Sequence, residues 1–164
     1  MRRRKTWREK LEDSKDLPKV VPLTGKMRER WGEGTILVPA PLDVDGVMKR
    51  VRKGKLVTVN MIREALAVRH GADLSCPMTT GILISIAAHA AEEAIENGKK
   101  RVTPYWRTLK AKGELNPKYP GGVASQRKRL EAEGHVVVVR GKRLFVQNFE
   151  SRLQPLTPSP RPGE

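Results

Sequence analysis

The sequence has little sulfur, few aromatic side chains and few histidines. Its 164 residues include a single cysteine, Cys76, and only 4% of them are aromatic. One cysteine cannot form an internal disulfide or supply a cysteine-rich zinc site. His70, His89 and His135 are scattered along the chain without the spacing of metal ligands. These absences predict a reduced, cytoplasmic protein that holds no metal and needs no cofactor.

Long apolar runs are missing as well. No stretch approaches the roughly 20 apolar residues that a membrane-spanning helix needs. The N-terminus is basic, but the apolar core of a secretory signal does not follow it. The sequence also contains neither a basic amphipathic helix nor a lipid-anchor motif, the usual means of binding an anionic membrane surface. A membrane partner is therefore not expected.

Acidic residues are scarce relative to basic ones. The chain has 33 lysines and arginines against 18 aspartates and glutamates, which gives a formal net charge of +15. Such a chain repels itself unless an anionic partner lies close to it. Phosphate backbones are the commonest partner of this kind, because each lysine or arginine contact releases condensed counterions. The composition thus predicts a nucleic-acid partner.

The pattern along the chain divides it into three parts. Residues 1–34 are charge-rich and poor in apolar side chains, which predicts a mostly extended basic arm. This arm either docks through Trp7 and Trp31 or remains a solvated tail. Residues 35–150 carry the compact pattern of a domain. Residues 151–164 are predicted to be disordered, because prolines prevent both helix and sheet pairing. These prolines are Pro155, Pro158, Pro160 and Pro162.

The central part predicts a small α+β domain. Thr58 is a plausible N-cap for a helix that Gly71 ends, and a largely apolar helix follows from about Met78 to Glu96. Two helices joined by a short loop, with a basic hairpin later, predict a helix-turn-helix with a winged-helix-like element. The expected elements are a strand at 35–38, helices at 43–51, 59–69, 78–96 and 124–133, extended chain at 102–109, and a hairpin at 135–146.

Three motifs, taken in order, resemble one known family. Residues 51–58 read Val-Arg-Lys-Gly-Lys-Leu-Val-Thr, residues 104–107 read Pro-Tyr-Trp-Arg, and residues 113–134 contain Tyr-Pro-Gly-Gly followed by Leu-Glu-Ala-Glu-Gly. Together they resemble the DNA-binding domain of the alkylguanine-DNA alkyltransferases and of the non-catalytic alkyltransferase-like proteins. The resemblance covers about half of the chain. It implies a repair-related fold that extrudes an alkylated base from double-stranded DNA into a pocket.

The resemblance also implies which residues form that pocket. Tyr105, Trp106 and Arg107 stand where the family has the Cys-His-Arg of its active-site tetrapeptide, and Tyr119 lies in the lid loop. Tyrosine, with a pKa near 10, does not replace the thiolate that accepts an alkyl group. We therefore predict a base pocket built from these four residues and no alkyl transfer, as in the alkyltransferase-like proteins.

A second set of residues is predicted to contact DNA. Met78 falls at the position of the arginine that the family inserts into the gap left by the extruded base. It either wedges into a base step or fills the core. Thr79 and Thr80 open the apolar helix, where they either hold a phosphate or cap the helix. The full set is Lys53, Thr58, Met78, Thr79, Thr80, Arg127 and Lys128, with Lys55, Arg140, Lys142 and Arg143 on the same basic surface.

Two alternative functions stay open. The apolar character of the helix at 78–96 and the missing arginine favour an RNA-binding or architectural module that reuses the fold. Cys76 precedes the N-terminus of that helix, where the helix dipole lowers the pKa of a thiol, so it could serve as a displaced alkyl acceptor. Against this, no histidine lies near Cys76 in sequence. The leading hypothesis remains a non-catalytic DNA-binding protein that recognises alkylated bases.

Overall fold

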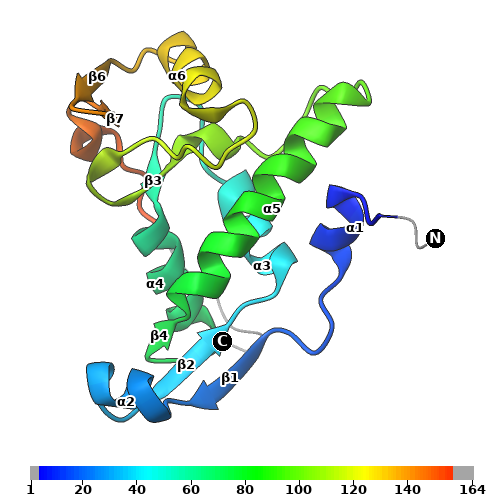
Figure 1. Ribbon diagram of the computed structural model, residues 1–164, viewed down its shortest axis with the longest axis vertical. Helices are drawn as coiled ribbons and strands as arrows, with labels where there is room; N and C mark the ends of the chain where they lie inside the picture. Colours follow the sequence, from blue (N-terminus) through cyan, green and yellow to red (C-terminus); the bar gives the residue numbers. More distant parts are fainter. Residues whose placement is uncertain (1–3, 157–164) are drawn as a thin grey trace.

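A computed structural model describes residues 4–156 and shows an α+β fold, as predicted (Figure 1). The long helix α5 runs through the centre, and most other elements pack around it. The helices are α1 (Trp7–Glu12), α2 (Gly25–Trp31), α3 (Pro41–Lys49), α4 (Val59–His70), α5 (Pro77–Glu96) and α6 (Gly122–Ala132). The strands are β1 (Lys19–Pro22), β2 (Thr35–Val38), β3 (Val57–Thr58), β4 (Leu74–Ser75), β5 (Thr108–Leu109), β6 (Val137–Arg140) and β7 (Arg143–Val146). Short 3-10 helices are η1 (Tyr105–Arg107), η2 (Ala111–Gly113) and η3 (Phe149–Arg152).

Helices α4 and α5 form the predicted helix-turn-helix pair. The hydroxyl of Thr58 accepts a hydrogen bond from the amide of Met61, and Gly71 ends α4 in the left-handed conformation that favours glycine. Pro77 occupies the first position of α5, where its missing N–H costs no hydrogen bond. Helix α5 is apolar nearly all round because α1, α3 and α4 all pack against it.

A second apolar cluster holds α6 and the hairpin to the rest of the domain. Strands β6 and β7 pair antiparallel across Gly141 and Lys142, as predicted. Leu130 of α6 and Val137 of β6 are both buried in this cluster. The other buried members are Leu56, Leu109, Leu115 and Val146. The hairpin is therefore an integral part of the domain core and not a loose appendage.

The N-terminal segment contains more regular structure than the sequence indicates. Strand β1 pairs antiparallel with β2, and β2 pairs parallel with β4, so residues 19–22 form the edge of a three-stranded sheet. Trp7 stacks on His89 of α5 with ring centroids 4.4 Å apart. The docking alternative thus applies to Trp7, whereas Trp31 stays exposed. Among the described residues, no helix is both long and apolar enough to cross a bilayer.

The chain after the hairpin remains in contact with the domain up to residue 156. Leu153 forms a bridge with Leu56, and the side-chain amide of Gln154 donates to the carbonyl of Arg50. The prediction of a disordered tail is therefore wrong for residues 151–156, because backbone pairing to the segment before β3 holds them in place. Residues 157–164, with three of the prolines behind that prediction, lie outside the described part of the chain.

Gly113 is the glycine whose missing side chain matters most for this packing. Its φ is +82°, and a Cβ there would lie 2.4 Å from the ring of Phe149. Gly113→Ala is expected to lower the free energy of unfolding by about 2 kcal/mol, through backbone strain and displacement of that ring. Urea unfolding measures the change. Gly46→Ala is the control, since nothing lies within 4 Å of its Cβ position, and an equal loss in both variants would contradict the prediction.

Candidate nucleic-acid interface

The first turns of α5, the second helix of the helix-turn-helix, expose apolar side chains. Met78 is 75% exposed and Ile82 is 55% exposed, whereas Leu83 and Ile84 are buried. The core-filling alternative for Met78 is therefore wrong, and its side chain is free to contact a partner. A long, flexible apolar side chain at the start of a helix is suited to wedge between base steps.

Two of the predicted contact residues do not offer free hydroxyls. Thr80 is fully buried, and its Oγ1 donates a 2.7 Å hydrogen bond to the carbonyl of Cys76. Thr58 is 9% exposed, and its Oγ1 serves the N-cap of α4. Neither side chain is available to a partner, because the Thr58 hydroxyl caps α4 and the Thr80 hydroxyl bonds to a carbonyl one turn earlier in the chain. Thr79 is only partly buried, but its Oγ1 lies 3.3 Å from the Sγ of Cys76 and donates to it.

The predicted cations gather around α6. Lys53 is exposed on the loop before β3, and this loop reaches the C-terminal end of α6, because the amide of Gly54 donates to Glu133. Lys128 is exposed on α6. Arg127 pairs with Glu131 at 3.2 Å, so its charge is partly neutralised within the helix. Lys53 and Lys128 are thus the more available cations of the predicted set.

The structure separates the predicted contacts into two groups. Figure 1 shows α6 and the β6–β7 hairpin at one end of the view, and the beginning of α5, beside β4, at the other. Helix α5 has 20 residues, which corresponds to a length of about 30 Å. A single duplex can contact both groups only if it extends along the molecule from one group to the other.

The predicted base pocket is closed in this structure. Tyr105 is fully buried and Tyr119 is 3% exposed, and the two rings meet edge to face at 5.2 Å. The Tyr105 hydroxyl donates to Glu92 at 3.0 Å, and the Tyr119 hydroxyl donates to the carbonyl of Thr108 at 2.9 Å. Both tyrosine rings therefore belong to the core in this structure and do not line an open pocket.

The Tyr105 hydroxyl is also unsuited to nucleophilic chemistry. Burial, followed by the charge and hydrogen bond of Glu92, raises the pKa of Tyr105 to about 12. Burial likewise raises the pKa of the Tyr119 hydroxyl. Both phenols are neutral near pH 7, so neither supplies an anionic nucleophile.

Arg107 and Trp106 are held together by Glu133, which belongs to the Leu-Glu-Ala-Glu-Gly motif but was not predicted to have a role in the site. Two nitrogens of Arg107 donate to the Glu133 carboxylate at 2.9 and 2.7 Å, and Trp106 Nε1 donates to it at 3.1 Å. Arg107 also donates to the carbonyl of Val51 at 2.7 Å. Arg107 thus links the start of the resembling region to its end. The motif contains Glu133, but nothing local in the sequence indicates that its carboxylate binds Arg107 and Trp106.

Cys76 lies apart from this network. It is 7% exposed, and its Sγ accepts a hydrogen bond from the hydroxyl of Thr79. Within the described part of the chain, no histidine bonds to this sulfur, so no neighbouring base of the kind that activates an acceptor thiol is in place. Within residues 4–156, no group of three or more histidine, cysteine, aspartate or glutamate side chains is arranged to hold a metal ion.

Comparisons with known proteins add little beyond this geometry. No protein-family model and no curated protein matches the chain. One similar solved structure is that of S. pombe Atl1 in complex with damaged DNA containing O6-carboxymethylguanine. It has a TM-score of 0.46 and 17% sequence identity, and the match covers 70% of this chain and 93% of Atl1. A likeness this weak decides nothing about what the present chain binds.

Proposed function

We propose that this protein is a non-catalytic DNA-binding protein that recognises alkylated bases in duplex DNA. The exposed Met78 carries the proposal, because it places an apolar wedge at the open end of a helix-turn-helix in a chain of net charge +15. Because Met78 is exposed, the core does not need its side chain, and burial of that side chain in a base step favours binding. The motif resemblance of residues 51–134 supports the choice of DNA and of an alkylated base.

The buried tyrosines restrict how such recognition would proceed. With Tyr105 and Tyr119 in the core, stacking of an extruded base on either ring requires a rearrangement of η1 or of the 116–121 loop. Trp106 is only partly buried, and the guanidinium of Arg129 lies over its indole, 4.6 Å from the ring centroid. Of the three aromatic side chains in the predicted pocket, Trp106 is thus the one that is not fully buried.

Met78→Ala is expected to weaken binding to a duplex with one O-alkylated guanine by about tenfold, and to weaken binding to the matched plain duplex much less. The reason is that burial of a methionine side chain in a base step is worth about 1.5–3 kcal/mol. Fluorescence anisotropy with both duplexes measures the difference. Met27→Ala is the matched control, since Met27 is also exposed but lies on α2.

An equal loss of affinity for both duplexes would contradict a role for Met78 in lesion recognition. The closed pocket favours a second candidate, an RNA-binding or architectural module that uses only the basic surface. This candidate predicts equal binding to plain and alkylated duplexes, and equal or tighter binding to structured RNA. The third hypothesis, Cys76 as alkyl acceptor, predicts stoichiometric labelling by an alkylated duplex that Cys76→Ser abolishes; its burial leads us to expect none.

A further inference from the structure

Three consecutive cations follow the C-terminal end of α5. Lys99, Lys100 and Arg101 are all exposed, and none of their charged groups forms an ion pair or hydrogen bond within residues 4–156. Cations that stabilise a helix dipole usually lie in the last turn of the helix, where α5 has none. The charge of this triplet is therefore available to a partner outside the chain.

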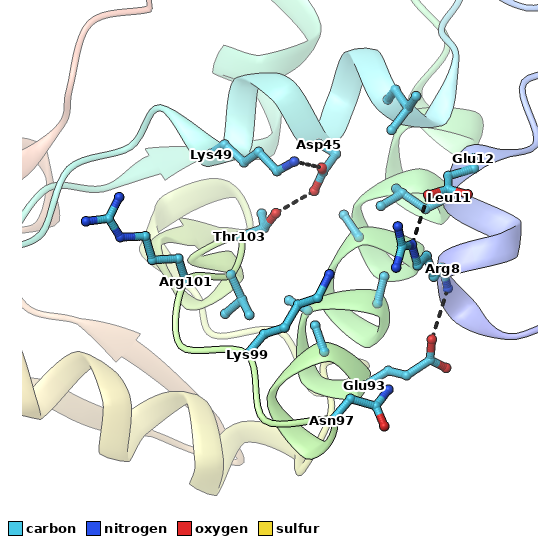
Figure 2. A pocket seen from close by; sticks show the side chains of 16 residues that line it. Arg8, Leu11, Glu12, Asp45, Lys49, Glu93, Asn97, Lys99, Arg101 and Thr103 are labelled. Carbon is cyan, nitrogen blue, oxygen red and sulfur yellow. Dashed lines mark hydrogen bonds and ion pairs between the residues drawn. The ribbon is translucent and has the colours of Figure 1, made fainter.

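The side chains of the triplet do not converge on one point. Figure 2 shows Lys99 extending into the cavity between α1, α3 and α5, whereas Arg101 points away from that cavity. One small anion cannot bind both of them. A row of separate anions can, and each strand of duplex DNA offers such a row, with one phosphate for about every 3.4 Å of helix axis. Arg101 and the exposed Lys100 beside it are the members that can reach a partner on the outer surface.

Most acids near the triplet are already engaged. Glu92 pairs with Arg129 of α6 at 3.3 Å, and the carboxylate of Glu93 accepts two backbone amides of α1 at 3.1 and 3.2 Å. Glu96 is the remaining acid in these last turns of α5, one negative charge beside the three cations of the triplet. This end of α5 therefore keeps a positive charge that suits a phosphate backbone.

Helix α1 brings a further cation to the same place. The backbone amide of Trp7 donates to Glu93, and the exposed Arg4 precedes Trp7 by three residues, so its Cα lies within about 11 Å of that of Trp7. The backbone amide of Lys99 donates to the carbonyl of Ala94, the residue after Glu93. Arg4 and the triplet are therefore tethered to the same turn of α5.

The cations of α6 lie at this end of the molecule as well. Figure 1 shows the β6–β7 hairpin, α6 and the last turns of α5 along one end of the view. The bond between Arg129 and Glu92 joins α6 directly to those turns. A phosphate backbone that contacts the exposed Lys128 of α6 can thus continue towards the triplet.

We propose that Arg4, Lys100 and Arg101 contact the phosphate backbone of duplex DNA and extend the contact surface of α6. The proposal rests on the duplex binding proposed above, and it gives α1 a role, which is to hold Arg4 at this surface. Phosphate contacts position a protein on DNA without reading the bases. The surface therefore serves plain and alkylated duplexes equally.

Lys100→Glu/Arg101→Glu is expected to weaken binding to plain and to alkylated duplex equally, by about 100-fold at low salt. The slope of log affinity against log salt should fall by about 1.8, because each phosphate contributes about 0.9. Anisotropy titrations of the full chain at several salt concentrations measure both quantities. Both side chains are exposed, so the variant should keep the native melting temperature. Lys15→Glu/Lys26→Glu is the charge-matched control, since both lysines are exposed and Lys26 lies on α2.

Trp7→Ala tests the role of α1 without a change in charge. Loss of the indole that stacks on His89 should release α1 from α5 and weaken binding to plain duplex by about tenfold, the usual effect of one lost phosphate contact. The domain should remain folded by circular dichroism, because α1 has no buried residue. Trp31→Ala is the control, since Trp31 is an exposed tryptophan on α2.

Three results would overturn the proposal. They are a loss in Lys100→Glu/Arg101→Glu no larger than in the charge-matched control, an unchanged salt slope, and a loss confined to structured RNA. Native affinity in Trp7→Ala would overturn the role of α1 and Arg4. A failure of lesion recognition looks different: the native chain would bind plain and alkylated duplexes equally, and Lys100→Glu/Arg101→Glu would still weaken both. Absence of any duplex binding by the native chain would overturn both proposals.

Discussion

Glu133→Ala is expected to lower the free energy of unfolding by about 3–5 kcal/mol, the usual cost of removing one partner from a buried ion pair. The Glu133 side chain is 8% exposed and that of Arg107 is 13% exposed, so water cannot replace the lost carboxylate. The substitution leaves Arg107 without its charge partner and leaves the indole N–H of Trp106 unpaired. Urea unfolding followed by circular dichroism measures the change.

Glu131→Ala is the matched control, because Glu131 lies two residues before Glu133, in the last turn of α6, and pairs with Arg127 in solvent. A surface pair of this kind is worth about 0.5 kcal/mol. Glu133→Gln separates charge from shape, since the amide retains the side-chain volume but not the negative charge. Equal losses in Glu131→Ala and Glu133→Ala would show that the network around Arg107 does not stabilise the fold.

The effect of Glu133→Ala is expected to depend on pH. Burial alone would raise the pKa of Glu133, but hydrogen bonds from Arg107 and Trp106 outweigh it and hold the pKa below the ordinary value of 4.5. A carboxyl with a lowered folded-state pKa stabilises the fold above its unfolded-state pKa, and this stabilisation is lost as the pH falls through the folded-state value. The native chain and Glu133→Ala should therefore converge in stability in acid and differ most near pH 7.

Local signals in the sequence were sufficient for the elements with strong caps and periodicity. The helix predicted at 59–69 is observed as Val59–His70, and that predicted at 78–96 as Pro77–Glu96. The helix placed at 43–51 begins earlier, at Pro41, because proline is favourable at the first helical position and Asp43 instead accepts the amide of Ala40 from inside the first turn. The hairpin strands needed only β-branched runs around a glycine turn.

Long-range contacts were not predictable in the same way. Helix α1 has six residues and no buried side chain, and Glu93, more than eighty positions away, accepts two of its amides. Strand β1 exists because β2 offers it a partner. For the same reason, the tetrapeptide at 104–107 marked residues of a contact network but did not indicate which of their side chains are buried. Only the tertiary fold shows that Tyr105 and Tyr119 are buried and that Glu133 holds Arg107.

Charge reversal at Lys53 and Lys128 together is expected to weaken binding to plain duplex DNA by about 100-fold at low salt. Both lysines are exposed near the C-terminal end of α6, on the side of the molecule that also carries the basic hairpin. Loss of one phosphate contact costs about tenfold, or 1.4 kcal/mol, and a glutamate adds repulsion. Anisotropy titrations of Lys53→Glu/Lys128→Glu at several salt concentrations measure the loss.

The salt dependence tells whether phosphate contacts cause this loss. Removal of two contacts should reduce the slope of log affinity against log salt by about 1.8, because each phosphate contributes about 0.9. Lys15→Glu/Lys26→Glu changes the net charge equally but lies in the N-terminal segment, far from α6 in the sequence and on other elements. Equal loss in both double variants would mean that DNA responds only to the total charge of the protein. Loss confined to the α6 variant would place the phosphate backbone along α6 and the hairpin, and the exposed Met78 would then have to reach the same duplex along the length of α5.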